Sequence, residues 1–572
     1  MNFHDSAQAL RRGAEAADHI AQGDGNTLLP EVPEQLLARI FSHLHDEDKQ
    51  RLLRHKIFPI AWLPHTTLFA KRSGTALHDG TVRPESIIAE ISSENYQNCI
   101  TAFLNNGLVE KATNGLRQQA PILSAHHRFN LQQSIVAAIF AASLLLIALF
   151  LPFEWLSNFC NAIFAVLFST MIVLRLLAIS TPEPSRQNLP RLKTQHLPVF
   201  SVLVPVFKET SVLHQLIRSL QNLNYPPEKL DIKIIVEAED RAMHRALAAI
   251  SLPSHFEILT VPKGKPQTKP RALNYALQFA RGELVTIYDA EDIPEPMQLR
   301  IAASAFGCQD PNIACLQGEL AFYNANENWL TRQFAMEYAT LFRVILPALA
   351  ALKLPLPLGG TSNHFKADAL RAIGGWDPYN VTEDADLGIR FARFGYGVAT
   401  LPSITYEEAN TQVRNWVHQR SRWLKGFLQT WLVHMRHPFL LVQEVGLLGF
   451  MVVQAATLGV VIAATFHPVF LGLALYQLYQ GSLTDLHASI PNVILNGVFL
   501  ANLLLGFGVA TVSGVLAMKR KRQQNQFWVH ASLPLYWLLM SLAGWKALWE
   551  FVWDPFHWNK TQHGISKFTH KA

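Results

Sequence analysis

The sequence PVFSVLVPVF at residues 198–207 opens a region in which apolar strand patterns alternate with helix patterns. A nearly continuous apolar run of this length, rich in valine, is typical of a strand buried on both faces. Further strands are predicted at 232–236, 257–261 and 284–288, and helices at 211–222, 240–250 and 270–280. This alternation predicts an α/β domain built on a parallel sheet with helices on both faces.

Acidic groups follow two of these strands, EAED at 237–240 and DAED at 289–292. Because parallel strands end at one edge of a sheet, where ligands bind, we expect the two groups to lie near that edge. Asp289 and Glu291 stand two positions apart. Their carboxylates can hold one Mg²⁺ or Mn²⁺, ions that take oxygen ligands and share them with substrate phosphates. Either group alone can equally be a solvated turn.

The composition of the 572 residues excludes an ordinary cytosolic protein. Hydrophobic residues make up 49% and charged residues only 16%, whereas soluble domains average about 25% charged residues. The net charge, 49 Lys and Arg minus 43 Asp and Glu, is +6. This mild excess suits anionic lipid or phosphate but is too weak to indicate nucleic acid. The four cysteines form no CxxC pair, which fits a reducing compartment.

The low share of charged residues comes mostly from a few long stretches that contain none. Residues 129–153 and 155–174 contain no charged residue, and about 20 apolar residues suffice for a membrane-spanning helix. They predict a transmembrane hairpin whose basic flanks face the cytoplasm. Uncharged stretches at 445–484, 488–518 and 527–545 predict three or four further spans.

The chain therefore divides into predicted parts: a small α+β domain at 1–125, the hairpin at 129–179, the α/β domain at 180–437, a membrane bundle at 438–552 and a tail at 553–572. The alternative is a transporter with a large loop. It is disfavoured because the uncharged stretches lack the intramembrane carboxylates that usually mark ion coupling. Residues 334–358 are apolar with a few charges, and they predict helices on the membrane surface or, equally, buried helices.

Two later motifs combine acidic, basic and aromatic residues, TED at 382–384 and QRSRW at 419–423. An Asp beside a sugar hydroxyl can act as a general base. Arginines bind a diphosphate through forked, charged hydrogen bonds, and a tryptophan face packs on a sugar ring. Taken alone, QRSRW is more typical of the basic start of a membrane-surface helix.

In this order, and between membrane spans, the motifs resemble those of the processive, membrane-embedded family 2 glycosyltransferases, the group of cellulose, chitin and hyaluronan synthases. The resemblance covers residues 198–437 and the flanking spans. Its pieces are VPVFKE at 204–209, the acids at 237–240, Lys269 with Asn274, DAE at 289–291, TED at 382–384, and Gln419, Arg422 and Trp423. GGTSNHF at 359–365 and WNKTQHG at 558–564 are similar to a bacterial exopolysaccharide-type subgroup.

The resemblance implies a GT-A fold, a UDP-sugar donor, a divalent ion and inverting transfer to a growing polysaccharide, coupled to export. It implies a bacterial inner-membrane protein with a cytoplasmic catalytic domain. The implied roles are Asp384 as general base; Glu237, Glu239 or Asp240, and Lys269, at the nucleotide; Asp289 and Glu291 at the metal; and Glu383, Gln419, Arg420, Arg422 and Trp423 at the acceptor and diphosphate. At positions 237 and 291, Glu replaces the usual Asp of the family.

Two other functions stay open at this stage. One is a non-processive transferase that acts on a lipid-linked acceptor, and the other is a non-catalytic membrane receptor or scaffold with a transferase fold. Residues 31–120 faintly resemble the small N-terminal domain of type II secretion ATPases, which can bind cyclic di-GMP, and a plain packing domain is the alternative. The expected partners are the sugar donor, the acceptor, the membrane, cyclic di-GMP and export proteins, with no nucleic acid.

Overall fold

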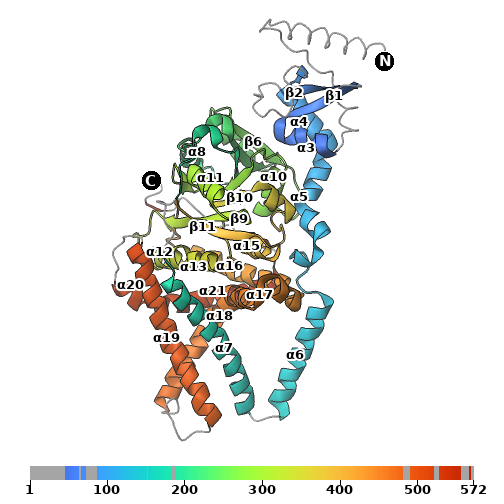
Figure 1. Cartoon of the computed structure of the whole chain (residues 1–572). Coiled ribbons are helices and arrows are strands. Elements are labelled where there is room, and N and C mark those ends of the chain that lie inside the picture. The colour runs from blue at the N-terminus through green and yellow to red at the C-terminus, as the bar shows by residue number, and fades with distance from the viewer. Residues whose placement is uncertain are drawn as a thin grey trace.

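The structure is a computed structural model that describes residues 46–63, 66–72, 87–150, 153–182, 189–480, 490–520, 527–555 and 566–567 (Figure 1). The WNKTQHG segment at 558–564 and residues 1–45 lie outside the described residues. Figure 1 shows a small sheet toward the N-terminus, a central α/β domain, and long helices that extend away from that domain.

The central domain is built on an eight-stranded sheet. From one edge to the other, its strands are β6 (Phe256–Val261), β5 (Leu230–Glu237), β4 (Phe200–Val206), β7 (Leu284–Ile287), β10 (Asn363–Lys366), β9 (Ile313–Phe322), β11 (Gly397–Glu407) and β8 (Ile293–Pro294). The first four are parallel, as predicted. However, β10 runs antiparallel to β7 and β9, and β8 antiparallel to β11, so the sheet is mixed rather than wholly parallel.

The reversed strand β10 has a topological cause. After β9, the chain forms α12 (Trp329–Thr340) and α13 (Leu346–Ala351), and these helices line the same cavity as the carboxyl ends of β5 and β7. The chain therefore re-enters the sheet from that edge, and β10 must run in the opposite direction. A parallel strand would need a crossover back to the other edge.

The helices of the domain are α8 (Leu213–Gln221), α9 (Arg241–Ala248), α10 (Lys269–Leu277), α11 (Gln298–Cys308), α14 (Ala367–Ala372), α15 (Glu383–Arg393) and α16 (Val413–His434). They cover both faces of the sheet, which is why β4 is apolar at every position except Ser201. Val202 and Val204 pack in the cluster of α8 and α11, whereas Leu203 packs on the other face with α10. All three side chains are fully buried. This burial holds the strand ends, where the acids follow, in fixed positions.

The helices outside the central domain and the small sheet are α6 (Leu131–Phe150), α7 (Phe153–Ser180), α17 (Pro438–Gln454), α18 (Val460–Tyr479), α19 (Ile490–Arg520), the short α20 (Phe527–Ala531) and α21 (Leu533–Trp553). Within the described part of the chain, four helical stretches are long and apolar enough to cross a membrane: Ala162–Ser180, Trp329–Ala351, Pro438–Gly472 and Val493–Arg520. The protein is therefore a membrane protein.

The stretch Trp329–Ala351 differs from the others in its burial. It is 67% buried within the protein, against 11% for the stretches in α7 and α19. It comprises α12, a π-helical turn and α13, and it contacts β9 and β11 on one side and α19 on the other. This segment therefore forms a floor between the sheet and the membrane helices (Figure 1).

A small three-stranded sheet stands before the membrane helices. Its elements are α3 (Asp46–His55), β1 (Ile57–Leu63), β2 (Thr66–Arg72), β3 (Ile87–Ile91), α4 (Ser93–Cys99) and α5 (Asn105–Gln119). Glu257 on β6 pairs with Lys56 at 3.0 Å, Arg72 at 2.8 Å and Lys233 at 2.5 Å. Burial alone would raise the pKa of Glu257, but these three cations hold it well below its usual range. The ion cluster joins the small sheet to the edge of the central one.

The segment between α5 and α6 is held by two residues of the central domain, Arg436 and Asp377, which we call the clasp. The Arg436 guanidinium donates to four carbonyls within residues 121–127, at 2.6–3.1 Å. Asp377 accepts from the Ala125 N–H at 2.5 Å and from the Ser124 hydroxyl at 3.2 Å. Burial raises the pKa of Asp377 to about 6.

Candidate active site

One cavity of about 1940 Å³ begins at the carboxyl ends of the strands and continues between the membrane helices. Of the residues predicted from the sequence, it is lined by Glu237, Glu239, Lys269, Asp289, Glu291, Glu383, Asp384, Gln419, Arg420, Arg422 and Trp423. Asp240 does not line it. The structure thus brings together residues that lie up to 186 positions apart in the chain, from 237 to 423.

Glu237 lies at the end of β5, where Arg271 of α10 holds its carboxylate. Arg271 Nη2 donates to both carboxylate oxygens, at 2.8 and 3.1 Å, and Nη1 donates to the Pro262 carbonyl at 2.9 Å. Burial raises the pKa of Glu237, and Arg271 opposes that effect. Arg271 is therefore a positioning residue for Glu237.

The next two acids have different surroundings. Glu239 stands at the rim of the cavity, where Lys263 at 2.7 Å lowers its pKa. Asp240 is buried and caps α9, because its carboxylate accepts from the N–H of Met243 at 3.1 Å and that of Lys208 at 2.6 Å. An Asp directly before a helix commonly has this position. Asp240 therefore holds the backbone, and the acids that face the cavity here are the two before it.

Lys269 opens α10 and reaches the end of β7. Its Nζ lies 2.5 Å from Asp289 Oδ1 and donates to the Gly360 carbonyl at 2.8 Å. Burial alone would lower the pKa of Lys269, but Asp289, Glu383 and Asp384 raise it above its ordinary value. The ammonium is therefore charged, and it lies between the DAED group and the TED group.

Three carboxylates crowd the end of β7. Burial and repulsion from Asp289 raise the pKa of Glu291 to about 8. Asp292 Oδ2 accepts from the Asp289 N–H at 2.7 Å and from the Thr361 hydroxyl, whereas its buried Oδ1 has no hydrogen-bond partner among the described residues. Within those residues, no three acids, histidines or cysteines surround a single metal position, and Lys269 occupies one oxygen of Asp289. The surplus of buried carboxylate oxygens fits a hard divalent cation.

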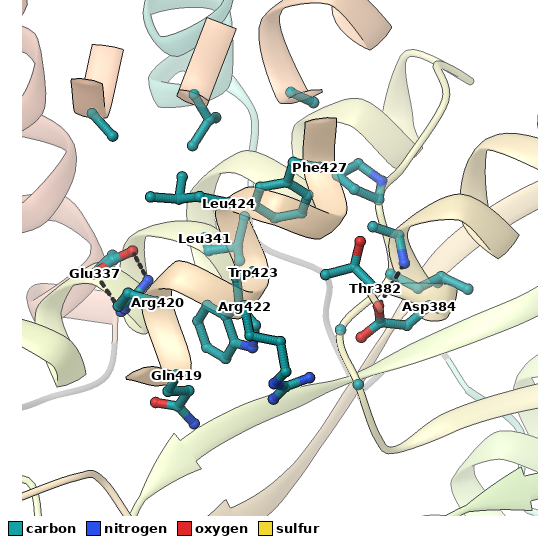
Figure 2. Close-up of a pocket in the computed structure, with 18 of the residues that line it drawn as sticks. Glu337, Leu341, Thr382, Asp384, Gln419, Arg420, Arg422, Trp423, Leu424 and Phe427 are labelled. Atoms are coloured by element: carbon teal, nitrogen blue, oxygen red, sulfur yellow. Dashed lines mark hydrogen bonds and ion pairs between the residues drawn. The ribbon is translucent and has the colours of Figure 1, made fainter. Parts of the chain in front are cut away.

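Asp384 lies in the first turn of α15 and faces the cavity (Figure 2). Its Oδ1 accepts from the Ala385 N–H at 2.8 Å. Burial raises the pKa of Asp384, and burial together with repulsion from Asp384 raises that of Glu383 to about 7. A carboxylate with a raised pKa is a better proton acceptor. Gly360 leaves room beside it, because a Cβ there would lie 3.1 Å from Asp384 Oδ2.

Helix α16 carries the predicted acceptor motif, and the first arginine of that motif, Arg420, contacts the floor of the domain (Figure 2). Arg420 donates to both carboxylate oxygens of Glu337 at 2.7 Å and to the Tyr536 hydroxyl at 3.2 Å. Its guanidinium also lies over the rings of Phe334, at 4.3 Å, and Trp423, at 4.6 Å. Arg420 therefore braces α16 against α12 and α21 and supports Trp423.

The second arginine lies on the other side of the helix, because residues two apart are separated by about 200° around an α-helix. Figure 2 shows the Arg422 guanidinium in the space between Trp423 and Asp384. Its Nη1 donates to the Val381 carbonyl at 3.4 Å. The Trp423 ring is stacked on Tyr338, with centroids 6.2 Å apart and an angle of 23°. Arg422 is thus the cation of the motif that faces Asp384.

The structure adds an acid that the motifs did not single out. Glu407 ends β11 and lines the cavity. Burial, with repulsion from Asp292 and Glu291, raises its pKa well above the ordinary value. Its place at the carboxyl end of a strand was a usable signal. The sequence carries no comparable indication that Glu337 would pair with Arg420, because the two residues lie 83 positions apart on different helices.

Residues 198–426 match the model of the family described as glycosyltransferase like family 2. This region is a family 2 glycosyltransferase domain. Its mixed, Rossmann-like sheet, flanked by apolar helices, has the GT-A arrangement, so the predicted fold class is confirmed. The predicted family is confirmed at the level of family 2 glycosyltransferases.

Known relatives of the chain are also glycosyltransferases. It is 26% identical over 245 residues to the probable glycosyltransferase YdaM of Bacillus subtilis, covering 42% of this chain and 58% of that protein. It is 26% identical over 358 residues to the beta-monoglucosyldiacylglycerol synthase of Trichormus variabilis, covering 61% and 70%. The solved mannosyltransferase PcManGT from Pyrobaculum calidifontis, in complex with GDP-Man and Mn²⁺, is 17% identical, with a TM-score of 0.43 and coverage of 69% and 99%. The chain thus spans less than two thirds of the YdaM protein.

Proposed function

We propose that this protein transfers a hexosyl group from a UDP-sugar to a hydroxyl of an acceptor, with inversion at the anomeric carbon. The proposal rests on one observation: acids at the ends of β5 and β7, a buried Asp in the first turn of α15 and a cation on α16 all face one cavity. The family match of residues 198–426 supports the same class of reaction. A non-catalytic receptor or scaffold would not need this complete set of groups.

The donor is proposed to bind with its uridine beside Glu237 and Glu239 and its diphosphate between Lys269 and Arg422. The carboxylates within 289–292 would hold Mg²⁺ or Mn²⁺, and a bound ion would supply positive charge to the departing diphosphate. The two cations Lys269 and Arg422 supply such charge from the chain itself, in fixed positions and away from bulk water.

The chemical step is proposed to use Asp384 as general base. As the acceptor oxygen attacks the anomeric carbon, its proton passes to the Asp384 carboxylate, and the bond between that carbon and the diphosphate oxygen breaks. Attack comes from the face opposite the leaving group, so an α-linked donor yields a β-linked product. The raised pKa of Asp384 favours proton acceptance.

Two acceptors have specific support. The QRSRW motif and the stacked Trp423 favour the end of a growing polysaccharide, which would be exported through the membrane helices. The similarity to a beta-monoglucosyldiacylglycerol synthase favours a lipid acceptor instead. In either case, we place the protein in a bacterial inner membrane with the transferase domain in the cytoplasm, because the predicted hairpin has basic flanks.

The test is an assay in membranes with a panel of UDP-sugars, in which UDP release and product size are measured. Asp384→Asn should abolish UDP release while UDP binding stays intact, because the substitution removes the base and leaves the nucleotide contacts. Unchanged turnover of this variant would refute the assignment of the base. Absence of UDP release from the wild-type protein with every donor would favour the scaffold instead.

Regulation by cyclic di-GMP through residues 1–125 is a separate hypothesis. It has a physical route, since the ion cluster around Glu257 connects the small sheet to the strand next to β5. Isothermal titration of the full chain with cyclic di-GMP tests it, and absence of binding heat would leave residues 1–125 as a packing domain.

A further inference from the structure

The part of the cavity between the membrane helices has an apolar lining. We call this part the apolar chamber, and it is defined by Phe168, Phe470, Phe499, Leu503, Phe507 and Met540. These residues come from α7, α18, α19 and α21. Three of those helices include stretches that are apolar enough to cross a membrane. The apolar chamber therefore lies at membrane depth.

Polar residues of this lining do not form a row of hydrogen-bonding groups. The Asn502 side chain accepts from the Ser169 hydroxyl at 3.0 Å and donates to a carbonyl of α7 at 3.2 Å. His467 lies edge-on against Phe507 and Trp537, with centroids 5.9 and 5.4 Å away. A polysaccharide here would bury many hydroxyls against carbon, which is costly in free energy. A hydrocarbon chain has no such groups to satisfy.

The apolar chamber and the catalytic groups belong to one continuous cavity. In Figure 2, Leu341, Leu424 and Phe427 lie between the membrane helices and Asp384. An apolar path therefore leads from membrane depth to the proposed base. A molecule that follows this path would be apolar along most of its length and would present one reactive end to Asp384.

We infer that the acceptor is a neutral lipid alcohol whose hydrocarbon chains occupy the apolar chamber while its free hydroxyl lies beside Asp384. This inference rests on the proposed function and specifies its substrate class. Lipid tails are about as apolar as leucine side chains, so a lipid enters such a lining from the bilayer without losing polar contacts. The head is neutral because Lys269 and Arg422 bind the donor diphosphate in the proposed function, so a second phosphate would add negative charge beside Glu383, Asp384 and Glu291.

Two glycines of α19 provide a matched pair of variants. Gly506 lines the cavity, and a Cβ built there meets no atom within 4 Å, so Gly506→Trp would project into the apolar chamber without a backbone clash. Gly508 also has no atom within 4 Å of a built Cβ, but it lies outside the cavity lining and is exposed on the helix. Gly508→Trp is therefore the control for a bulky residue on α19.

The experiment uses the full chain in phosphatidylcholine vesicles with its UDP-sugar donor and four acceptors: dioleoylglycerol, dihexanoylglycerol, a polyprenyl phosphate and a water-soluble oligosaccharide. We expect dioleoylglycerol to be glycosylated fastest. Gly506→Trp should lower that rate by about tenfold or more, whereas Gly508→Trp should stay within about twofold of wild type. UDP binding should be the same in all three proteins. A photoactivatable diacylglycerol should label peptides of α18 or α19 in wild type and not in Gly506→Trp.

The outcomes separate the inference from the proposed function. UDP release that depends on the oligosaccharide, with no effect of chain length or of Gly506→Trp, would overturn the lipid inference and leave the transferase proposal standing. Preference for the polyprenyl phosphate would overturn the neutral headgroup. No UDP release with any acceptor, together with no photolabelling, would overturn both. Equal loss in the two tryptophan variants would show that bulk on α19, rather than the apolar chamber, decides the rate, and would also overturn the inference.

Discussion

Lysine substitutions at Arg420 and Arg422 of α16 distinguish a residue that holds the helix in place from one that contacts the leaving group. Arg420→Lys keeps a charge but loses the fork that binds both oxygens of Glu337 at 2.7 Å. A hydrogen bond to a charged group contributes about 1.5–3 kcal/mol, and a desolvated cation–π contact contributes about 2 kcal/mol or more. Because the Glu337 side chain is 37% exposed, solvent screening places the expected loss of stability near the lower end, about 2 kcal/mol.

Arg422→Lys should lower turnover rather than stability. Arg422 faces the cavity and donates to the Val381 carbonyl at 3.4 Å, a long hydrogen bond whose loss costs little stability. If it stabilises the departing diphosphate, its replacement should lower kcat about 100-fold, the usual scale for loss of one such group. Arg420→Lys should lower the unfolding temperature by a few degrees and leave the affinity for UDP unchanged.

The assay combines thermal unfolding of detergent-solubilised protein with UDP release at saturating donor. The reasoning would be refuted by the reverse pattern, in which Arg420→Lys unfolds like wild type but loses turnover and UDP affinity. That result would mean that Arg420 leaves Glu337 in the working enzyme and contacts the nucleotide itself.

The other predictions concern the base, the metal and the N-terminal sheet. Since burial raises the pKa of Asp384, its carboxylate is lost as pH falls through that raised value, and the acid limb of kcat/KM should lie above the ordinary Asp pKa of about 3.8. Gly360→Ala should lower kcat in the same assay with unchanged UDP affinity, because its Cβ would press on Asp384. Removing divalent ions with EDTA should abolish UDP release, and Mg²⁺ or Mn²⁺ should restore it. Glu257→Gln should cost about 3 kcal/mol at the ion cluster and raise hydrogen exchange in β1 and β2, with kcat unchanged.

Much of the site was predictable because strand ends carry its acids. The apolar run of β4 and the acidic turns after β5 and β7 are local patterns, and the parallel sheet brings those turns to one edge. The reversed strand β10 was not predictable in this way, since its direction depends on where α12 and α13 lie. Short strands of this kind carry no periodic signal of their own.

The side chains of Arg420 and Arg422 show what the sequence alone cannot predict about the site. Helical geometry alone separates Arg420 from Arg422, yet it does not say which of them faces Asp384. That choice depends on Glu337 and Tyr536, which come from other helices. Asp240 is the converse case, because an Asp at the start of a predicted helix is a common cap. The family resemblance implied a place at the nucleotide for it instead.

The clasp has a practical consequence for dividing this protein into pieces. A fragment that begins at residue 180, where the transferase domain was expected to start, would lack all four carbonyls that bind the Arg436 guanidinium and the N–H that binds Asp377. The Arg436 guanidinium would then lose these partners, and the Asp377 carboxylate would keep the N–H of Tyr379. The unit that folds together is therefore longer than the unit that matches its family. The segment that leads to α6 therefore helps to hold the TED group, which begins five residues after Asp377 in the chain, at the start of α15.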